Sequence, residues 1–216
     1  MKKESGNTLK RSLLSVLVTF ALCTPHAMAF TPSVPNGEKV TGEVVENGTQ
    51  TIQKGGEASH TTINKGGTQH VSSGGTAIDT TIYNGGTLNI DTGGSATSVQ
   101  QKSGAALTAT TATGTTVKGT NGLGEFSIEN GQANNVLLEN GGELTVVNGT
   151  TATGTTVNDG GLMMTAGTDS DTTVQAGGRY ILGKYTATPD DPDAAWTYAD
   201  TATAQNLTVT GGTAQV

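Results

Sequence analysis

A 19-residue repeat marked by pairs of glycines constrains the fold of this chain more than any other feature. Glycine pairs lie at 55–56, 66–67, 74–75, 85–86 and 93–94, and the longer and shorter intervals between them alternate. Residues 61–79 align with residues 80–98 without a gap and match at nine positions, and residues 42–60 fit the same frame. Self-similarity at a short fixed period is typical of solenoids and other repeat architectures.

Each period contains an aliphatic residue, two polar positions and then a glycine pair. A β-branched residue pointing inward from a short strand fits this pattern, and glycine fits the tight turn because it adopts positive φ without a Cβ clash. The sequence therefore predicts an all-β parallel β-helix (β-solenoid) with about 19 residues per rung and two glycine corners in each rung. The expected inward residues are Ile52, Ile63, Val71, Ile82, Ile90, Leu138, Val157 and Val174. The expected turn residues are Gly55, Gly56, Gly66, Gly67, Gly74, Gly75, Gly85, Gly86, Gly93, Gly94, Gly141, Gly142, Gly160, Gly161, Gly177 and Gly178.

The repeat loosens in the second half of the chain. The octapeptide of residues 110–117 recurs without change at residues 150–157, an offset of 40 that two slightly enlarged periods would produce. About eight rungs then fit between residue 36 and residue 216, stacked about 4.8 Å apart. Asparagines beside the corner glycines either stack into a ladder or serve as ordinary turn residues, and both alternatives remain open. They are Asn47, Asn84, Asn130, Asn140 and Asn148.

The segment 1–29 has the features of a secretory signal peptide. A cationic start precedes an apolar run over residues 12–23, which is too short to span a bilayer as a helix. Ala27 and Ala29 supply the small residues of a cleavage site, so cleavage is expected before Phe30. Lipidation at Cys23 is the alternative, but Leu22 stands where a small residue is needed.

The remaining chain divides by composition. Residues 30–41 are expected to be a flexible lead-in with two prolines, and residues 42–178 to be the β-helix repeats. Residues 179–205 break the pattern and are predicted to form an acidic and aromatic insertion loop. The repeat resumes over residues 206–216, which are expected to begin a further rung. A solenoid that ends within a rung exposes an unpaired edge, so we expect the chain to be incomplete.

Charge and cysteine content exclude several functions. The net charge of the whole chain is −7, and it becomes −10 when residues 1–29 are removed. Nucleic acid is therefore not an expected partner, since such proteins need clustered Lys and Arg. Without Cys23 the chain has no cysteine, which excludes disulfides and cysteine nucleophiles.

The signal peptide followed by glycine-paired repeats resembles the passenger region of AIDA-type autotransporter adhesins, including self-associating surface antigens of enteric bacteria. The resemblance covers residues 40–216 and depends on the paired units 61–79 and 80–98, on the Thr-Thr-(Val/Ile)-x-x-Gly-Gly segments 61–67 and 155–161, and on residues 206–213. It implies a right-handed parallel β-helix that an outer-membrane β-barrel carries to the cell surface. Its implied partners are a like passenger on a neighbouring cell or a receptor on a host surface.

Two departures from that family qualify the expectation. No segment shows the alternating strands and aromatic girdles of a barrel, and no long extension precedes the signal peptide. We therefore expect an N-terminal passenger fragment that lacks the barrel. It belongs at the cell surface or outer membrane if a translocator is present, and is otherwise periplasmic or secreted. Adhesion, cell aggregation or biofilm formation is the expected function, and a truncated, non-functional remnant is the alternative.

No motif in the sequence predicts catalysis or a cofactor. His60 and His70 lie at outward polar positions without an associated serine motif, so we interpret them as surface residues. The acidic segment Asp169-Ser170-Asp171 lacks a calcium-repeat pattern, and Gly122-Leu123-Gly124 lacks the helix of a nucleotide site. A carbohydrate-active β-helix is the enzyme alternative, and it would use the acidic residues and the tryptophan of the insertion. These are Asp190, Asp191, Asp193 and Trp196.

Overall fold

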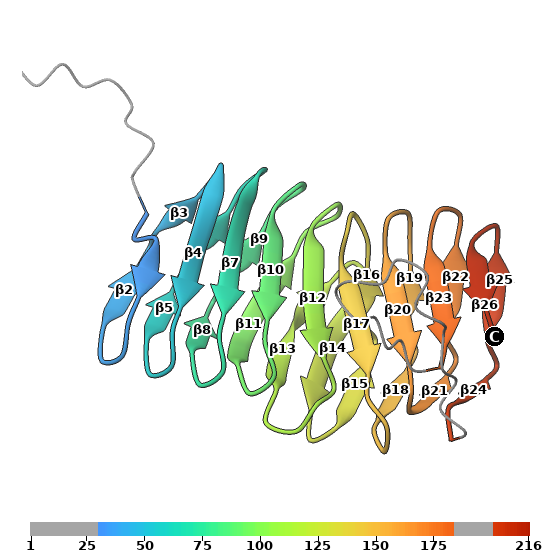
Figure 1. Cartoon of the computed structure of the whole chain (residues 1–216). Coiled ribbons are helices and arrows are strands. Elements are labelled where there is room, and N and C mark those ends of the chain that lie inside the picture. The colour runs from blue at the N-terminus through green and yellow to red at the C-terminus, as the bar shows by residue number, and fades with distance from the viewer. Residues whose placement is uncertain (1–29, 184–200) are drawn as a thin grey trace, which may run out of the picture.

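A computed structural model of the protein describes residues 30–183 and 201–216. All helical or extended segments assigned in these ranges are β-strands, with no helix among them. The strands wind into a parallel solenoid of about eight rungs (Figure 1). The predicted all-β parallel β-helix is therefore confirmed. Each rung has three sides, which we call faces A, B and C.

Face A is a nine-stranded sheet in which each strand pairs with the strand one rung away. Its strands are β1 (Ser33–Val34), β4 (Gly48–Ile52), β7 (Gly67–Val71), β10 (Thr87–Ile90), β12 (Ala106–Thr110), β17 (Glu143–Val146), β20 (Leu162–Thr165), β23 (Arg179–Leu182) and β26 (Thr213–Gln215).

Face B follows face A in each rung and is also continuous along the rod. Its strands are β2 (Lys39–Thr41), β5 (Glu57–Ser59), β8 (Thr76–Ile78), β11 (Ser95–Gln101), β13 (Thr116–Asn121), β14 (Gly124–Glu129), β15 (Gln132–Asn134), β18 (Thr151–Thr153), β21 (Thr168–Ser170) and β24 (Thr203–Gln205).

Face C consists of two groups of short strands, one before β14 and one after it. The first group is β3 (Val44–Val45), β6 (Thr62–Ile63) and β9 (Thr81–Ile82), which joins face B through β11. The second is β16 (Leu137–Leu138), β19 (Thr156–Val157), β22 (Thr173–Gln175) and β25 (Thr208–Thr210).

The register of the parallel strands confirms a rung of about 19 residues. Gly48 pairs with Gly67 and Thr68 pairs with Thr87, so each residue lies beside its equivalent one period later, and later rungs vary around this spacing. Because identical positions stack, each face contributes a buried column to the core. The columns of the first rungs are Val34, Ile52, Val71 and Ile90 on face A, Ala58, Ala77 and Ala96 on face B, and Val45, Ile63 and Ile82 on face C.

The two glycines of each pair have different roles. The first has positive φ, for example +77° at Gly55 and +78° at Gly66. The second lies against a carbonyl of the preceding rung: a Cβ on Gly67 would be 2.1 Å from the Val45 oxygen, and on Gly161 2.3 Å from the Leu138 oxygen. The first position therefore needs glycine for its backbone conformation, and the second needs it for space.

The two predicted glycine corners do not account for every corner of a rung, because a third corner separates face B from face C. It is formed by single residues with positive φ, and most of them are not glycine. Asp, Asn and His tolerate this conformation better than most residues, so no glycine pair marks the corner in the sequence. The corner residues are Gly42, His60, Asp79, Ser98, Asn135, Gly154, Asp171 and Asn206.

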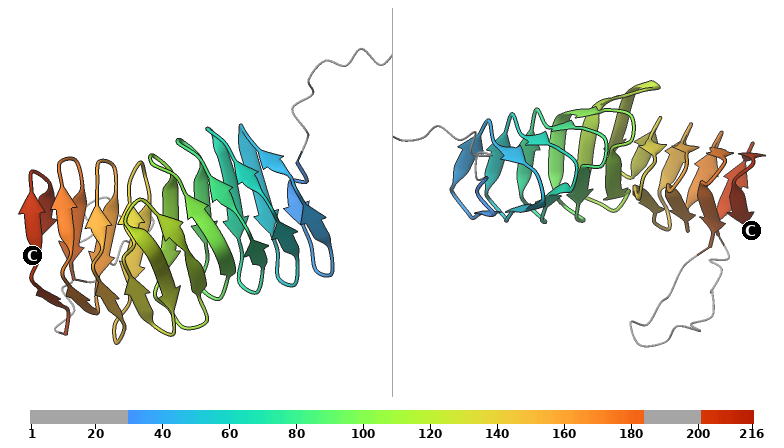
Figure 2. Two further views of the ribbon diagram at one scale, coloured as in Figure 1. Left: turned by 180° about the vertical axis from the view of Figure 1, so that it is seen from behind. Right: turned by 90° about the horizontal axis from the view of Figure 1, so that it is seen from above.

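The interpretation of the octapeptide offset as two enlarged periods is wrong. Thr108 on β12 pairs with Glu143 on β17, so a single enlarged rung runs from Thr108 to Glu143. The additional residues form the antiparallel strands β13, β14 and β15 within face B, and the β13–β14 hairpin projects beyond the neighbouring rungs (Figure 2).

The domain boundaries differ from those expected. The expected lead-in contains β1 and β2, which pair with β4 and β5, so the solenoid begins before Gly42. The expected insertion 179–205 begins with β23 and ends with β24, and both strands belong to the rod. Residues 184–200 lie outside the described residues.

Candidate functional site

The outer surface of face A carries polar side chains in register. Because side chains alternate along a strand, the residues between the buried positions point outward. Thr49, Thr68 and Thr87 form one outward file on β4, β7 and β10. A second file consists of Ser33, Thr51, His70, Asn89 and Thr108. The rod therefore presents hydrogen-bonding groups on this face about every 4.8 Å.

The outward files of face A change character toward the C-terminal rungs. Leu162 and Met164 occupy outward register positions on β20, and Ile181 does so on β23. Leu162 and Met164 are half-buried, and Ile181 is buried. The repeated polar surface thus belongs to the first rungs.

Both histidines of the described residues pair with a carboxylate of the following rung. His70 Nε2 lies 2.9 Å from Asp91 Oδ2 on face A, and His60 Nε2 lies 3.5 Å from Asp79 Oδ2 at the third corner. The side chain of His60 is exposed and that of His70 is half-buried, so both lie at the surface. His60 additionally forms the corner through its positive φ.

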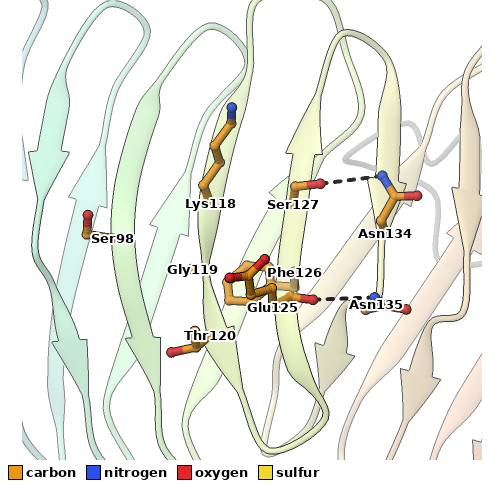
Figure 3. A pocket seen from close by; sticks show the side chains of 9 residues that line it. All are labelled: Ser98, Lys118, Gly119, Thr120, Glu125, Phe126, Ser127, Asn134 and Asn135. Carbon is orange, nitrogen blue, oxygen red and sulfur yellow. Dashed lines mark hydrogen bonds between the residues drawn. The ribbon is translucent and has the colours of Figure 1, made fainter.

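A polar hollow lies where the column of third-corner residues is interrupted between Ser98 and Asn135 (Figure 3). Its volume is about 530 Å³. The column breaks here because β13 and β14 continue past the corner position as a hairpin. Polar side chains from β13, β14 and β15 and from the two flanking corners line the hollow. They are Ser98, Lys118, Thr120, Glu125, Ser127, Asn134 and Asn135.

Hydrogen bonds and one ion pair hold the walls of the hollow in place. Lys118 Nζ lies 2.8 Å from Glu129 Oε2. Asn134 Nδ2 donates to Ser127 Oγ and Asn135 Nδ2 donates to the Glu125 carbonyl, each at 3.4 Å. Both of these hydrogen bonds are long, so the carboxamides of Asn134 and Asn135 keep hydrogen-bonding capacity for another partner.

Gly119 and Phe126 also line the hollow, and the Phe126 ring belongs to the hydrophobic core. These residues pair across β13 and β14, and the Phe126 side chain is only 3% exposed. Glycine is needed at 119 because a Cβ there would lie 2.1 Å from the Val99 oxygen. This site was not predicted from the sequence, although Asn121-Gly122 between two segments of alternating apolar and polar residues is a recognised hairpin signal.

A second hollow, of about 470 Å³, lies at the glycine corner between faces C and A. Its Glu139 carboxylate accepts a hydrogen bond from Gly104 N at 2.7 Å, and Asn140 Nδ2 donates to Gly104 O at 2.8 Å. The Glu139 and Asn140 side chains connect Gly104 to the next rung. On the other side, the preceding rung connects to Gly104 through the backbone, because Gly85 N donates to Gly104 O. Glu139 and Asn140 of this hollow thus join the two halves of the rod.

The segment Asp169-Ser170-Asp171 does not bring its two carboxylates together. Asp169 is fully buried on the inner side of β21, and Asp171 lies at the third corner, where its Oδ1 accepts a hydrogen bond from Asn206 Nδ2. Burial raises the pKa of Asp169, and a 2.7 Å hydrogen bond from Thr172 Oγ1 opposes this rise. Across the part of the chain that is described, no three His, Cys, Asp or Glu residues cluster as metal ligands.

The corner asparagines do not form a stacked ladder. Asn47, Asn130 and Asn140 have positive φ, whereas Asn84 and Asn148 precede glycines that do. The next rung places Gly66 against Asn47 and Gly104 against Asn84, so these two asparagines lie against glycines and not against other asparagines.

The remaining predicted site residues lie at the margins. Phe30 lies against Gly48, and a Cβ added to Gly48 would be 2.9 Å from the Phe30 ring. Ala27 and Ala29 of the expected cleavage site lie outside the described residues, as do Asp190, Asp191, Asp193 and Trp196. Among the residues in view, no helix has the length and apolar character to cross a membrane.

Comparison with known proteins gives consistent matches. Residues 33–86, 54–105 and 118–178 match the family described as adhesin of bacterial autotransporter system, probable stalk. The chain is 46% identical over 112 residues to the probable autotransporter YpjA of Escherichia coli (strain K12), and the match covers 52% of this chain and 7% of that protein. The chain therefore spans only a small part of this curated relative. A crystal structure of a TibC-catalysed, hyper-glycosylated fragment of TibA is 30% identical, with 70% of this chain and 64% of that chain covered and a TM-score of 0.33.

Proposed function

The chain belongs to the family of bacterial autotransporter adhesin stalks, and from this premise we propose that it is a non-enzymatic passenger segment that mediates adhesion by pairing with like surfaces. As an AIDA-type passenger it has a role at the cell surface. Export with cleavage after Ala29, and delivery by an outer-membrane barrel of a longer protein, are parts of this proposal.

The outward polar files of face A carry the proposal. Threonine hydroxyls at Thr49, Thr68 and Thr87 both donate and accept hydrogen bonds and recur once in each of three successive rungs. A second copy with the same spacing can therefore pair with this face in register through many weak bonds. Such multivalent contact gives strong attachment without any indispensable residue. The expected partner is a like passenger on a neighbouring cell, with a receptor on a host surface as the other candidate.

Charge on face A tests this function. The variant Thr68→Glu/Thr87→Glu places two like charges on adjacent rungs, and it should abolish the aggregation of beads coated with the full chain. The control Thr76→Glu/Ser95→Glu makes the same change on face B in the same rungs, where both residues are equally half-buried. Light scattering measures the aggregate size. The proposal is contradicted if beads coated with the face A variant still aggregate. It is also contradicted if only the face B control loses aggregation.

A further inference from the structure

We propose that the polar hollow beside the β13–β14 hairpin binds a neutral oligosaccharide. The volume of the hollow, about 530 Å³, lies within the range of small-molecule sites, roughly 300–1,000 Å³. It lies on the sheet of face B, away from the threonine files of face A. The inference therefore goes beyond the pairing function and does not depend on it.

The lining groups suit a polyhydroxyl ligand. Ser98, Thr120 and Ser127 contribute hydroxyls, and Asn134 and Asn135 contribute carboxamides. Hydroxyls and carboxamides each donate and accept, as do the adjacent hydroxyls of a pyranose ring. A carboxamide can thus bond two neighbouring sugar hydroxyls at once, one through its nitrogen and one through its oxygen.

The charges of the hollow disfavour ionic ligands. Lys118 is the only cation in the lining, and Glu129 holds its ammonium at 2.8 Å. A phosphate or sulfate group would need free cations, which the lining does not offer. Glu125 is the only carboxylate of the lining, whereas a calcium ion needs six to eight oxygen ligands, usually with several carboxylates.

The strands around the hollow also disfavour an extended peptide. Peptides that add to a sheet need a free strand edge. Here β13 pairs with β11 and β14, and β15 pairs with β14 and β18, so both edges of each of these strands are occupied. The same pairing fixes Thr120, Ser127 and Asn134 on one continuous sheet, so the site is formed before any ligand arrives.

Saturation-transfer NMR on the purified full chain tests the site. The probes are maltotriose, cellotriose and triacetylchitotriose, with a heparin tetrasaccharide as the charged comparison. We expect at least one neutral trisaccharide to bind saturably and the heparin tetrasaccharide not to bind. Asn134→Ala and Thr120→Val should each weaken that binding about tenfold, the loss expected when one or two hydrogen bonds are removed.

Asn89→Ala is the matched control, because Asn89 is also a half-buried, outward asparagine on a parallel strand, but on face A. This variant should bind the trisaccharide as tightly as the unmodified chain. The inference is overturned if no neutral probe binds, if both hollow variants retain full affinity, or if only the heparin fragment binds. Bead aggregation by Asn134→Ala should remain unchanged, so failure here is distinct from failure of the pairing function.

Discussion

Gln69 Nε2 donates a hydrogen bond of 2.8 Å to Gln50 Oε1 of the preceding rung, within the core, where both side chains are fully buried. The series continues on both sides, because Gln50 Nε2 donates to the Glu43 carboxylate and Thr80 Oγ1 donates to Gln69 Oε1 at 3.0 Å. Leu88 and Leu107 occupy the same column in the next two rungs. The first rungs therefore have a polar internal ladder that an aliphatic column replaces farther along.

Replacing two members of this ladder together should cost less than the sum of the two single replacements. Gln69→Leu leaves Gln50 Oε1 and Thr80 Oγ1 buried without a partner, so we expect the free energy of unfolding to fall by about 1–3 kcal/mol. Gln50→Leu/Gln69→Leu extends the existing leucine column, and its cost should be smaller than the sum of the two single changes. Denaturant unfolding of the four proteins measures the coupling. Strictly additive costs would show that the ladder does not act as a unit.

Asp169 replaces an alanine in a buried column and should make stability depend on pH. Its neighbours in the column are Ala152 and Ala204, and the Tyr180 ring on the adjacent face is also buried. Burial raises the pKa of Asp169, with a smaller contribution from the charge of Asp171. Burial, followed by the Asp169 charge, likewise raises the pKa of Tyr180.

The sign of the pH effect follows from the raised pKa. Below the pKa of the unfolded state, near 3.8, Asp169 is protonated in both the folded and the unfolded state, so its burial does not lower the stability through a charge. As the pH rises, the unfolded chain releases the proton first, so stability is lost until the folded-state pKa is passed. Asp169→Asn should remove this loss and melt at a higher temperature than the unmodified chain near neutral pH, but not at about pH 3. Parallel melting curves at all pH values would contradict this assignment.

The sequence predicted the repeat but could not show the third corner. Glycine pairs reveal the two corners where positive φ and lack of space occur together, as at Gly66 and Gly67. The third corner requires positive φ alone, and His60, Asp79 and Ser98 meet that need with side chains that differ from rung to rung. No recurring letter marks this corner, and its position depends on the stacking of whole rungs.

The repeated octapeptide shows a second limit of prediction from sequence. Thr116–Val117 lies on face B in β13, whereas the identical Thr156–Val157 lies on face C in β19. Val117 and Val157 are both fully buried, so local hydrophobicity is satisfied in either place. The first copy starts at the last residue of β12, one corner earlier in its rung than the second copy, and it continues into the β13–β14 hairpin. The hollow depends on that same hairpin, and could not be placed without it.

Gly119 should be essential for the hairpin, whereas Gly122 should not. A Cβ at Gly119 would lie 2.1 Å from the Val99 oxygen, within the pairing of β13 with β11. Gly119→Ala should therefore reduce the free energy of unfolding by roughly 2–4 kcal/mol, because backbone must move to relieve the clash. Gly122→Ala is the control, since nothing lies within 4 Å of its Cβ position. Equal stability of the two variants in denaturant unfolding would contradict the close approach of β11 and β13.

Glu139 should control how firmly the two halves of the rod are joined. In the regular rungs the corner glycines bond to one another, as Gly66 N does to Gly85 O, but Gly104 N has Glu139 Oε1 as its acceptor at 2.7 Å. Glu139→Ala removes this acceptor, so hydrogen exchange at the Gly104 amide should quicken by about tenfold or more, with a loss of about 1–3 kcal/mol in stability. Glu139→Gln keeps an acceptor oxygen on the same side chain and should preserve most of the protection. Exchange at Gly66, whose acceptor is a backbone carbonyl, should be unchanged in both variants, because the effect belongs to the junction and not to the whole solenoid. Equal acceleration at Gly66 and Gly104 would instead mean that the rungs open together and that the side-chain junction has no separate role.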